Sequence, residues 1–380
     1  MHRILLSLFF LLAINFTNVN AKDESYKIKI SIDGISNDFG ILAYYYSDTK
    51  YSHDTIYFDV NGVGFITDEE PIKTGIYLIA LPKMNLRYFE FILGDEKEFS
   101  LATDTTDLIG NMVVKNSKEN DLFYANLKFM IDKGEKSATL KENLKGKEEG
   151  SAEYQQILDE LAIIDSEIQL FRKDLINRYP DAFYTKLLQL MQEVELPENP
   201  NPSDSSFAYR YYQKHYFDNI DLTDDRLIRT PVFLTKINRF LDNYTIPVPD
   251  SINLAADKIL ATAQPNYDMF QFLLQSIFNK YAKSKIMSHE LVYVHLAQKY
   301  YSDTTLVDWI EDEQRTKIMD VVRKKSPTLL GNIAPNIFIK DVEGNNKTLH
   351  EVAANYDYTI LSFWNSSCGH CKKEMPCLLY

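Results

Sequence analysis

The sequence of 380 residues predicts a multi-domain chain of the α+β class, with a β-rich region first, a helical region second and a short α/β region last. Apolar and polar residues alternate from Tyr26 to about Val114, which is typical of strands with one buried face. From about Glu119 to Arg323 apolar residues recur at steps of three and four, the spacing of amphipathic helices. A chain of this length is expected to divide into two or three domains, because single cores stop growing at roughly 250–300 residues.

The N-terminus has the features of a secretory leader. A short polar start is followed by the apolar run Ile4–Ile14, and Val19-Asn20-Ala21 offers a cleavage site of small residues. The run is shorter than the roughly 20 apolar residues that span a bilayer. We therefore predict a cleaved signal peptide over residues 1–21, export to the periplasm of the cell envelope, and no integral membrane span. An uncleaved anchor is the alternative.

Residues 22–116 are predicted to form a β-sandwich-like domain of seven or so strands. Tyr26, Ile28, Ile30 and Ile32 alternate with polar residues and should lie on one buried face. The segments Asp54–Val60 and Val63–Thr67 flank Asn61-Gly62, which predicts a two-residue hairpin. Three further strands are expected at Gly75–Leu81, Arg87–Leu93 and Glu98–Ala102. The one histidine of this region, His53, is interpreted as a surface loop residue.

Residues 117–328 are predicted to form an all-α domain. The clearest helix is Ala152–Arg178, which should end at Tyr179-Pro180 because the residue before proline is disfavoured in helical angles. Further helices are expected at Asp204–Phe217, Pro231–Asn243, Ser251–Ala263, Tyr267–Ala282, His289–Tyr300 and Asp308–Arg323.

The histidines of this region give no catalytic pattern. His289 and His295 are six residues apart, whereas a zinc-protease helix needs histidines four apart. His215 stands among aromatic residues and is interpreted as an ordinary core or surface residue. The sequence has no glycine-rich phosphate loop, so no cofactor is expected. The net charge of −13 argues against nucleic acid as a partner.

All three cysteines, Cys368, Cys371 and Cys377, lie close to the C-terminal end. The first two form a Cys-x-x-Cys between a predicted buried strand, Tyr358–Trp364, and a helical start at Lys372. A helix N-terminus carries partial positive charge and stabilises a thiolate, the species that attacks disulfides. This layout predicts a dithiol redox site.

The same residues resemble the opening of a TlpA/ResA-type thioredoxin-like domain. The likeness rests on the Phe-Trp of the predicted strand, on Cys368-Gly-His-Cys371, on Lys372-Lys-Glu374 with Pro376 behind it, and on the stretch Gly331–Gly344 upstream. Three stretches, Tyr216–Arg226, Thr230-Pro231 and Lys280–Met287, make residues 211–330 resemble a helical region of unknown function that precedes this domain in envelope proteins of Gram-negative bacteria. The resemblance implies that residues 329–380 are the start of a thioredoxin-like α/β domain that the chain leaves incomplete.

The resemblance also implies roles for the residues of the motif. Cys368 would be the exposed nucleophile and Cys371 the buried resolving thiol. His370 would lower the pKa of Cys368 further, Glu374 would relay a proton to the buried thiol, and Pro376 would kink the active-site helix. An ordinary surface position is the alternative for Glu374.

The sequence departs from the family at two positions of the motif region, and it also lacks the later part of the domain. Ser367 stands where the family motif often has tryptophan, and Ser362 stands where cytoplasmic thioredoxins carry a buried aspartate. The later strands and the cis-proline loop that faces the dithiol are missing. The chain as given is therefore expected to be a poor enzyme.

The predicted function is that of an exported thiol–disulfide oxidoreductase that reduces disulfides of envelope proteins. Its expected partners are protein disulfide substrates and an unknown membrane electron donor. Cys-Gly-His-Cys also occurs in disulfide isomerases, so the redox direction stays open. Two alternatives remain: a non-enzymatic periplasmic binding module with a vestigial dithiol, and a Cu(I) or zinc site at the Cys-x-x-Cys.

Overall fold

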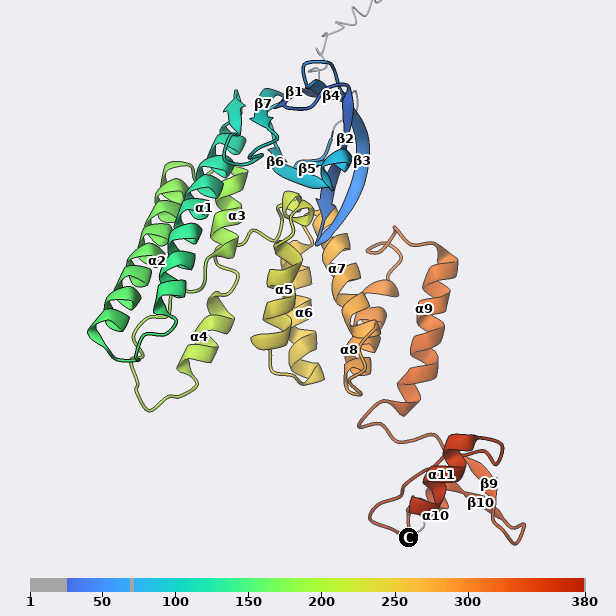
Figure 1. Cartoon of the computed structure of the whole chain (residues 1–380). Helices are drawn as coiled ribbons and strands as arrows, with labels where there is room; N and C mark the ends of the chain where they lie inside the picture. The colour runs from blue at the N-terminus through green and yellow to red at the C-terminus, as the bar shows by residue number, and fades with distance from the viewer. Residues whose placement is uncertain (1–25, 69–71, 379–380) are drawn as a thin grey trace, which may run out of the picture. The chain divides into compact units, whose positions relative to one another are not determined.

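The computed structural model describes residues 26–68 and 72–378 (Figure 1). It confirms a mixed α+β chain with sheets at the N-terminal side and a helical middle. The chain divides into two compact units. One consists of the chain up to Pro247 together with Leu254–Gln275, and the other of Val248–Asn253 together with the chain from Ser276 onward. The predicted signal peptide, residues 1–21, lies outside the described residues.

The first unit begins with two four-stranded sheets, ordered β4-β1-β7-β8 and β3-β2-β5-β6. Their strands are β1 Tyr26–Asp33, β2 Asp38–Tyr46, β3 Thr49–Phe58, β4 Val63–Asp68, β5 Gly75–Leu81, β6 Arg87–Leu93, β7 Glu98–Asp104 and β8 Val113–Lys115. Strands β1 and β7 pair in parallel, and the other pairs are antiparallel. The rings of Phe91 and Phe99 meet between the sheets with centroids 6.4 Å apart.

The alternation in β1 has the predicted result, since its apolar residues are buried and its lysines are exposed. The predicted hairpin at Asn61-Gly62 is wrong, because β3 and β4 belong to different sheets and the turn carries the chain from one sheet to the other. Gly62 has φ +70°, and a Cβ there would lie 2.2 Å from the carbonyl oxygen of Ile32. His53 is exposed as predicted, but it lies within β3 and not in a loop.

Helices make up the rest of the first unit. They are α1 Lys118–Leu144, α2 Ala152–Arg178, α3 Phe183–Met191, α4 Phe207–His215, the 3₁₀ turn Asp225–Arg229 and α5 Phe233–Asn243; α6 Pro249–Ala263 and α7 Tyr267–Ala282 contribute residues to both units. The long helices α1 and α2 run side by side (Figure 1), and the rings of Phe129 and Phe171 stack between them at 4.1 Å. The bounds of α2 and α7 are as predicted, whereas no individual helix was predicted at α1 or α3.

Two side chains of α1 join it to its neighbours. Asn120 is fully buried, and its amide exchanges hydrogen bonds of 2.8 and 2.9 Å with the backbone of Ile92 on the edge strand β6. Glu119 accepts hydrogen bonds from the backbone N–H groups of Phe183 and Tyr184, at the start of α3. Its burial raises the pKa of Glu119 above the usual range.

The second unit continues with α8 His289–Leu296, a π-helical turn Ala297–Tyr301, α9 Asp312–Lys325, a 3₁₀ turn Ser326–Thr328, β9 Phe338–Lys340, β10 Asn346–Thr348, α10 Leu349–Ala353 and α11 Gly369–Leu378. The guanidinium of Arg315 on α9 donates to the carbonyl oxygens of Tyr301 and Val307. In the part of the chain that the structure describes, no helix is both long and apolar enough to cross a membrane.

The predicted buried strand Tyr358–Trp364 is wrong for this structure. The segment has no regular secondary structure, and Tyr358, Ile360 and Phe363 are 92, 88 and 80 % exposed. A strand is stabilised by hydrogen bonds to a neighbour. Among the described residues β9 and β10 pair with each other and no strand pairs with this segment, so it forms no ladder.

Candidate dithiol site

The loop before α11 brings Cys368 to the start of that helix. The side-chain oxygen of Asn365 accepts hydrogen bonds from the N–H and hydroxyl of Ser367, both at 2.8 Å. The N–H of Cys368 in turn donates to the carbonyl oxygen of Asn365 at 3.0 Å. The tight turn therefore ends at Cys368, whose carbonyl oxygen accepts the first helical hydrogen bond, from the N–H of Lys372.

The two cysteine side chains face each other across the first turn of α11. The backbone N–H of Cys371 donates to Sγ of Cys368 at 3.3 Å, and both thiols are free and partly exposed. The pKa of Cys368 is lowered. The largest cause is the Cys371 side chain, and the backbone N–H groups of Cys371 and His370 contribute less. Hydrogen bonds to the charged form favour that form, so the geometry favours a thiolate on Cys368.

The other predicted site residues contribute less in this structure. The side chains of His370 and Glu374 are exposed, and within the described part of the chain neither has a hydrogen-bond or ion-pair partner. His370 contributes to the lowered pKa of Cys368 through its backbone N–H, and the role predicted for its ring remains a prediction. The Pro376 side chain lies outside the described residues, so the predicted kink remains a prediction.

The metal alternative gains no support from the described residues. Among the side chains that the structure describes, which do not include that of Cys377, no group of three or more His, Cys, Asp or Glu residues is placed to hold a metal ion. A structural zinc site needs four ligands, and Cys368 with Cys371 supplies two.

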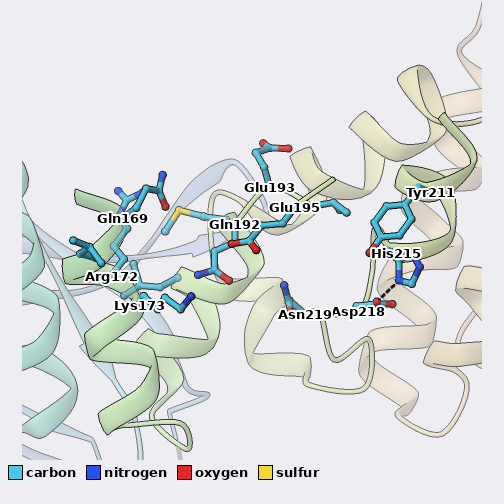
Figure 2. A pocket seen from close by; sticks show the side chains of 14 residues that line it. Gln169, Arg172, Lys173, Gln192, Glu193, Glu195, Tyr211, His215, Asp218 and Asn219 are labelled. Carbon is cyan, nitrogen blue, oxygen red and sulfur yellow. Dashed lines mark hydrogen bonds and ion pairs between the residues drawn. The ribbon is translucent and has the colours of Figure 1, made fainter. Parts of the chain in front are cut away.

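The structure also reveals a cavity that the sequence did not indicate. It has a volume of about 700 Å³ and lies in the first unit, between α2, the end of α3 with the loop behind it, and α4 (Figure 2). His215, interpreted from the sequence as an ordinary residue, lines this cavity, and its Nδ1 lies 2.6 Å from the carboxylate of Asp218. The spacing of three residues between His215 and Asp218 is the signal that could have identified the pair.

Comparisons with known proteins give a family match for part of the chain. A model described as a domain of unknown function (DUF5106) matches residues 147–325, a range that contains the cavity but not the cysteines. No curated protein matches the chain. The chain is weakly similar to a crystal structure of a thioredoxin-like protein from Bacteroides caccae, with 16% identity and a TM-score of 0.34 over 50% of this chain and 67% of that one.

Proposed function

We propose that the protein is an exported thiol–disulfide oxidoreductase of the TlpA/ResA type, acting through Cys368 and Cys371 in the periplasm. One observation carries the proposal: a partly exposed thiol at a helix start receives an N–H hydrogen bond from the second cysteine of a Cys-x-x-Cys. A thiol with a lowered pKa is ionised to a greater extent near neutral pH, and the thiolate is the attacking species.

The reaction has two exchange steps. The Cys368 thiolate attacks one sulfur of a substrate disulfide, so a mixed disulfide forms and the other substrate sulfur leaves as a thiolate. Cys371 then loses its proton and attacks Sγ of Cys368. The substrate leaves with both sulfurs reduced, and Cys368 and Cys371 become a disulfide. Two electrons pass to the substrate in this way, and an electron donor, proposed to be a membrane protein, must restore the dithiol.

The remaining motif residues have supporting roles in this proposal. Glu374 lies one turn after Cys371 and is proposed to accept the proton of the resolving thiol. His370 and Pro376 are proposed to shape the helix start through the backbone. Exchange at the partly exposed Cys368 needs no metal or cofactor in this scheme, since all electrons come from the two thiols.

A trapping experiment tests the order of the two steps. In a Cys377→Ser background, Cys371→Ala leaves the attacking thiol in place and removes the resolving one. Incubated with an oxidised protein such as insulin, this variant should accumulate a mixed disulfide, which mass spectrometry would assign to Cys368. The matched variant Cys368→Ala should accumulate far less. Equal trapping by the two variants would show that Cys368 is not the nucleophile.

A further inference from the structure

The cavity of the first unit has walls of opposite charge. Figure 2 shows Arg172 and Lys173 of α2 on one side and Tyr211, His215 and Asp218 on the other. Glu193 and Glu195, from the loop after α3, lie between them (Figure 2). The volume of about 700 Å³ falls within the range of roughly 300–1,000 Å³ that is common for small-molecule sites.

The α2 wall presents cations that no carboxylate neutralises. Arg172 lines the cavity and has no carboxylate partner within the described residues, and one of its Nη atoms donates to the thioether sulfur of Met130 at 3.5 Å, a weak acceptor. Lys173 has no ion-pair partner within the described residues. A partly buried cation without an anion costs free energy, so this wall favours an anionic group of a ligand.

The facing loop leaves one carboxylate without a cation. Glu193 is paired with Arg239 at 2.6 Å, and Asp218 is held by His215 at the same distance. Glu195, by contrast, has neither an ion pair nor a hydrogen bond among the described residues. Its carboxylate is therefore available to a ligand cation.

The third wall is aromatic. The ring centroids of Tyr211 and His215 lie 4.2 Å apart with the rings tilted by 31°, and the contact of His215 with Asp218 holds the imidazole in place. Such a surface suits a planar group, for example a peptide unit or an aromatic side chain. The side-chain amides of Gln169 and Asn219 also line the cavity and can donate or accept hydrogen bonds.

We propose that this cavity binds a zwitterion, namely a free amino acid or a short peptide with free termini. Its carboxylate lies on Arg172 and Lys173, its ammonium group on Glu195, and its side chain or peptide unit against Tyr211. This binding site is independent of the dithiol, because all of its residues lie within the first unit and no cysteine takes part.

The test uses the full chain and a defined set of probes: the twenty free amino acids and trialanine, screened by thermal shift and measured by calorimetry. At least one probe should raise the melting temperature. Its affinity should fall about tenfold or more in Lys173→Gln and in Glu195→Gln, since each removes one charge contact. N-acetylation or C-amidation of the probe should cause a loss of similar size. Binding of trialanine alone would identify peptides as the ligand class, and binding of single amino acids alone would identify free amino acids.

Matched controls separate this result from general effects of charge and folding. Lys141→Gln and Glu198→Gln remove exposed charges outside the cavity and should leave the affinity unchanged. The proposal is wrong if no probe binds, if the two cavity variants bind as the wild type does, or if inorganic phosphate binds as tightly as the zwitterion. A Cys368→Ser, Cys371→Ser variant should bind normally, so loss of the proposed redox activity would not affect this result.

Discussion

Replacing Asn120 by alanine tests how much the hydrogen bonds between α1 and the sheet β3-β2-β5-β6 contribute to stability. The Asn120 amide satisfies both backbone groups of Ile92 on the outer edge of β6, through hydrogen bonds of 2.8 and 2.9 Å at a site with no solvent exposure. Alanine would leave one N–H and one C=O without partners.

Each buried unsatisfied group costs about 1–3 kcal/mol. Water entering the space left by the amide would recover part of this cost. We therefore expect Asn120→Ala to lower the free energy of unfolding by about 2–4 kcal/mol. Urea denaturation followed by circular dichroism measures this loss, provided that the slope of the transition is unchanged.

The control is Asn143→Ala, which removes an exposed asparagine from the same helix and should change the free energy by less than about 0.5 kcal/mol. A loss below about 1 kcal/mol for Asn120→Ala would refute the reasoning. It would mean that water satisfies Ile92 as well as the side chain does.

Three further predictions concern the turn between the sheets, the half-buried Glu119 and the Cys368 thiol. Gly62→Ala should lower the free energy of unfolding by more than about 2 kcal/mol, because Gly62 has positive φ and a Cβ there would lie 2.2 Å from a backbone oxygen. The control Gly134→Ala adds a Cβ in open space on α1 and should raise the free energy of unfolding by about 0.5–1 kcal/mol. Burial raises the pKa of Glu119, so its favourable contribution is present below about pH 4.5 and is lost as the pH rises through the raised folded value. Wild type should therefore gain stability over Glu119→Gln as the pH falls from 7 to about 4, and a difference independent of pH would contradict this sign. The pH profile of the alkylation rate of Cys368 with iodoacetamide should have its midpoint below pH 9.0. Cys371→Ala should move that midpoint upward, because the Cys371 side chain is the largest cause of the lowered pKa of Cys368. An unchanged midpoint would show that the Cys371 side chain does not lower this pKa.

Local sequence patterns predicted individual strands and helices of this chain better than they predicted which strands pair with each other. Alternation in β1 and three- and four-residue spacing in α2 depend on which face is buried, and both elements formed as expected. The turn at Asn61-Gly62 has the composition of a hairpin, but composition does not determine which strand lies next to β4. The partner is β1, and that choice depends on the packing of the two sheets.

The candidate sites show the same difference between local features, which the sequence predicts, and tertiary contacts, which it does not. The Cys-x-x-Cys is local in sequence, and its two cysteines lie together at a helix start. The exposed segment Tyr358–Trp364 needed neighbouring strands that no local pattern supplies. The cavity gathers residues from α2, α4 and the loop after α3, and their meeting follows from helix packing. The His215–Asp218 pair has a local signal in its spacing of three residues, but its place in the cavity could be recognised only from the structure.

The most direct test of the central claim is the rate at which the full chain, in a Cys377→Ser background, catalyses reduction of insulin disulfides by dithiothreitol. The proposed dithiol chemistry predicts that this protein accelerates the reaction above the rate with dithiothreitol alone. It also predicts that replacing Cys368 by serine returns the rate to that background. A rate equal to the background with both cysteines present, or one unchanged by Cys368→Ser, would contradict the assignment of Cys368 and Cys371 as a redox pair.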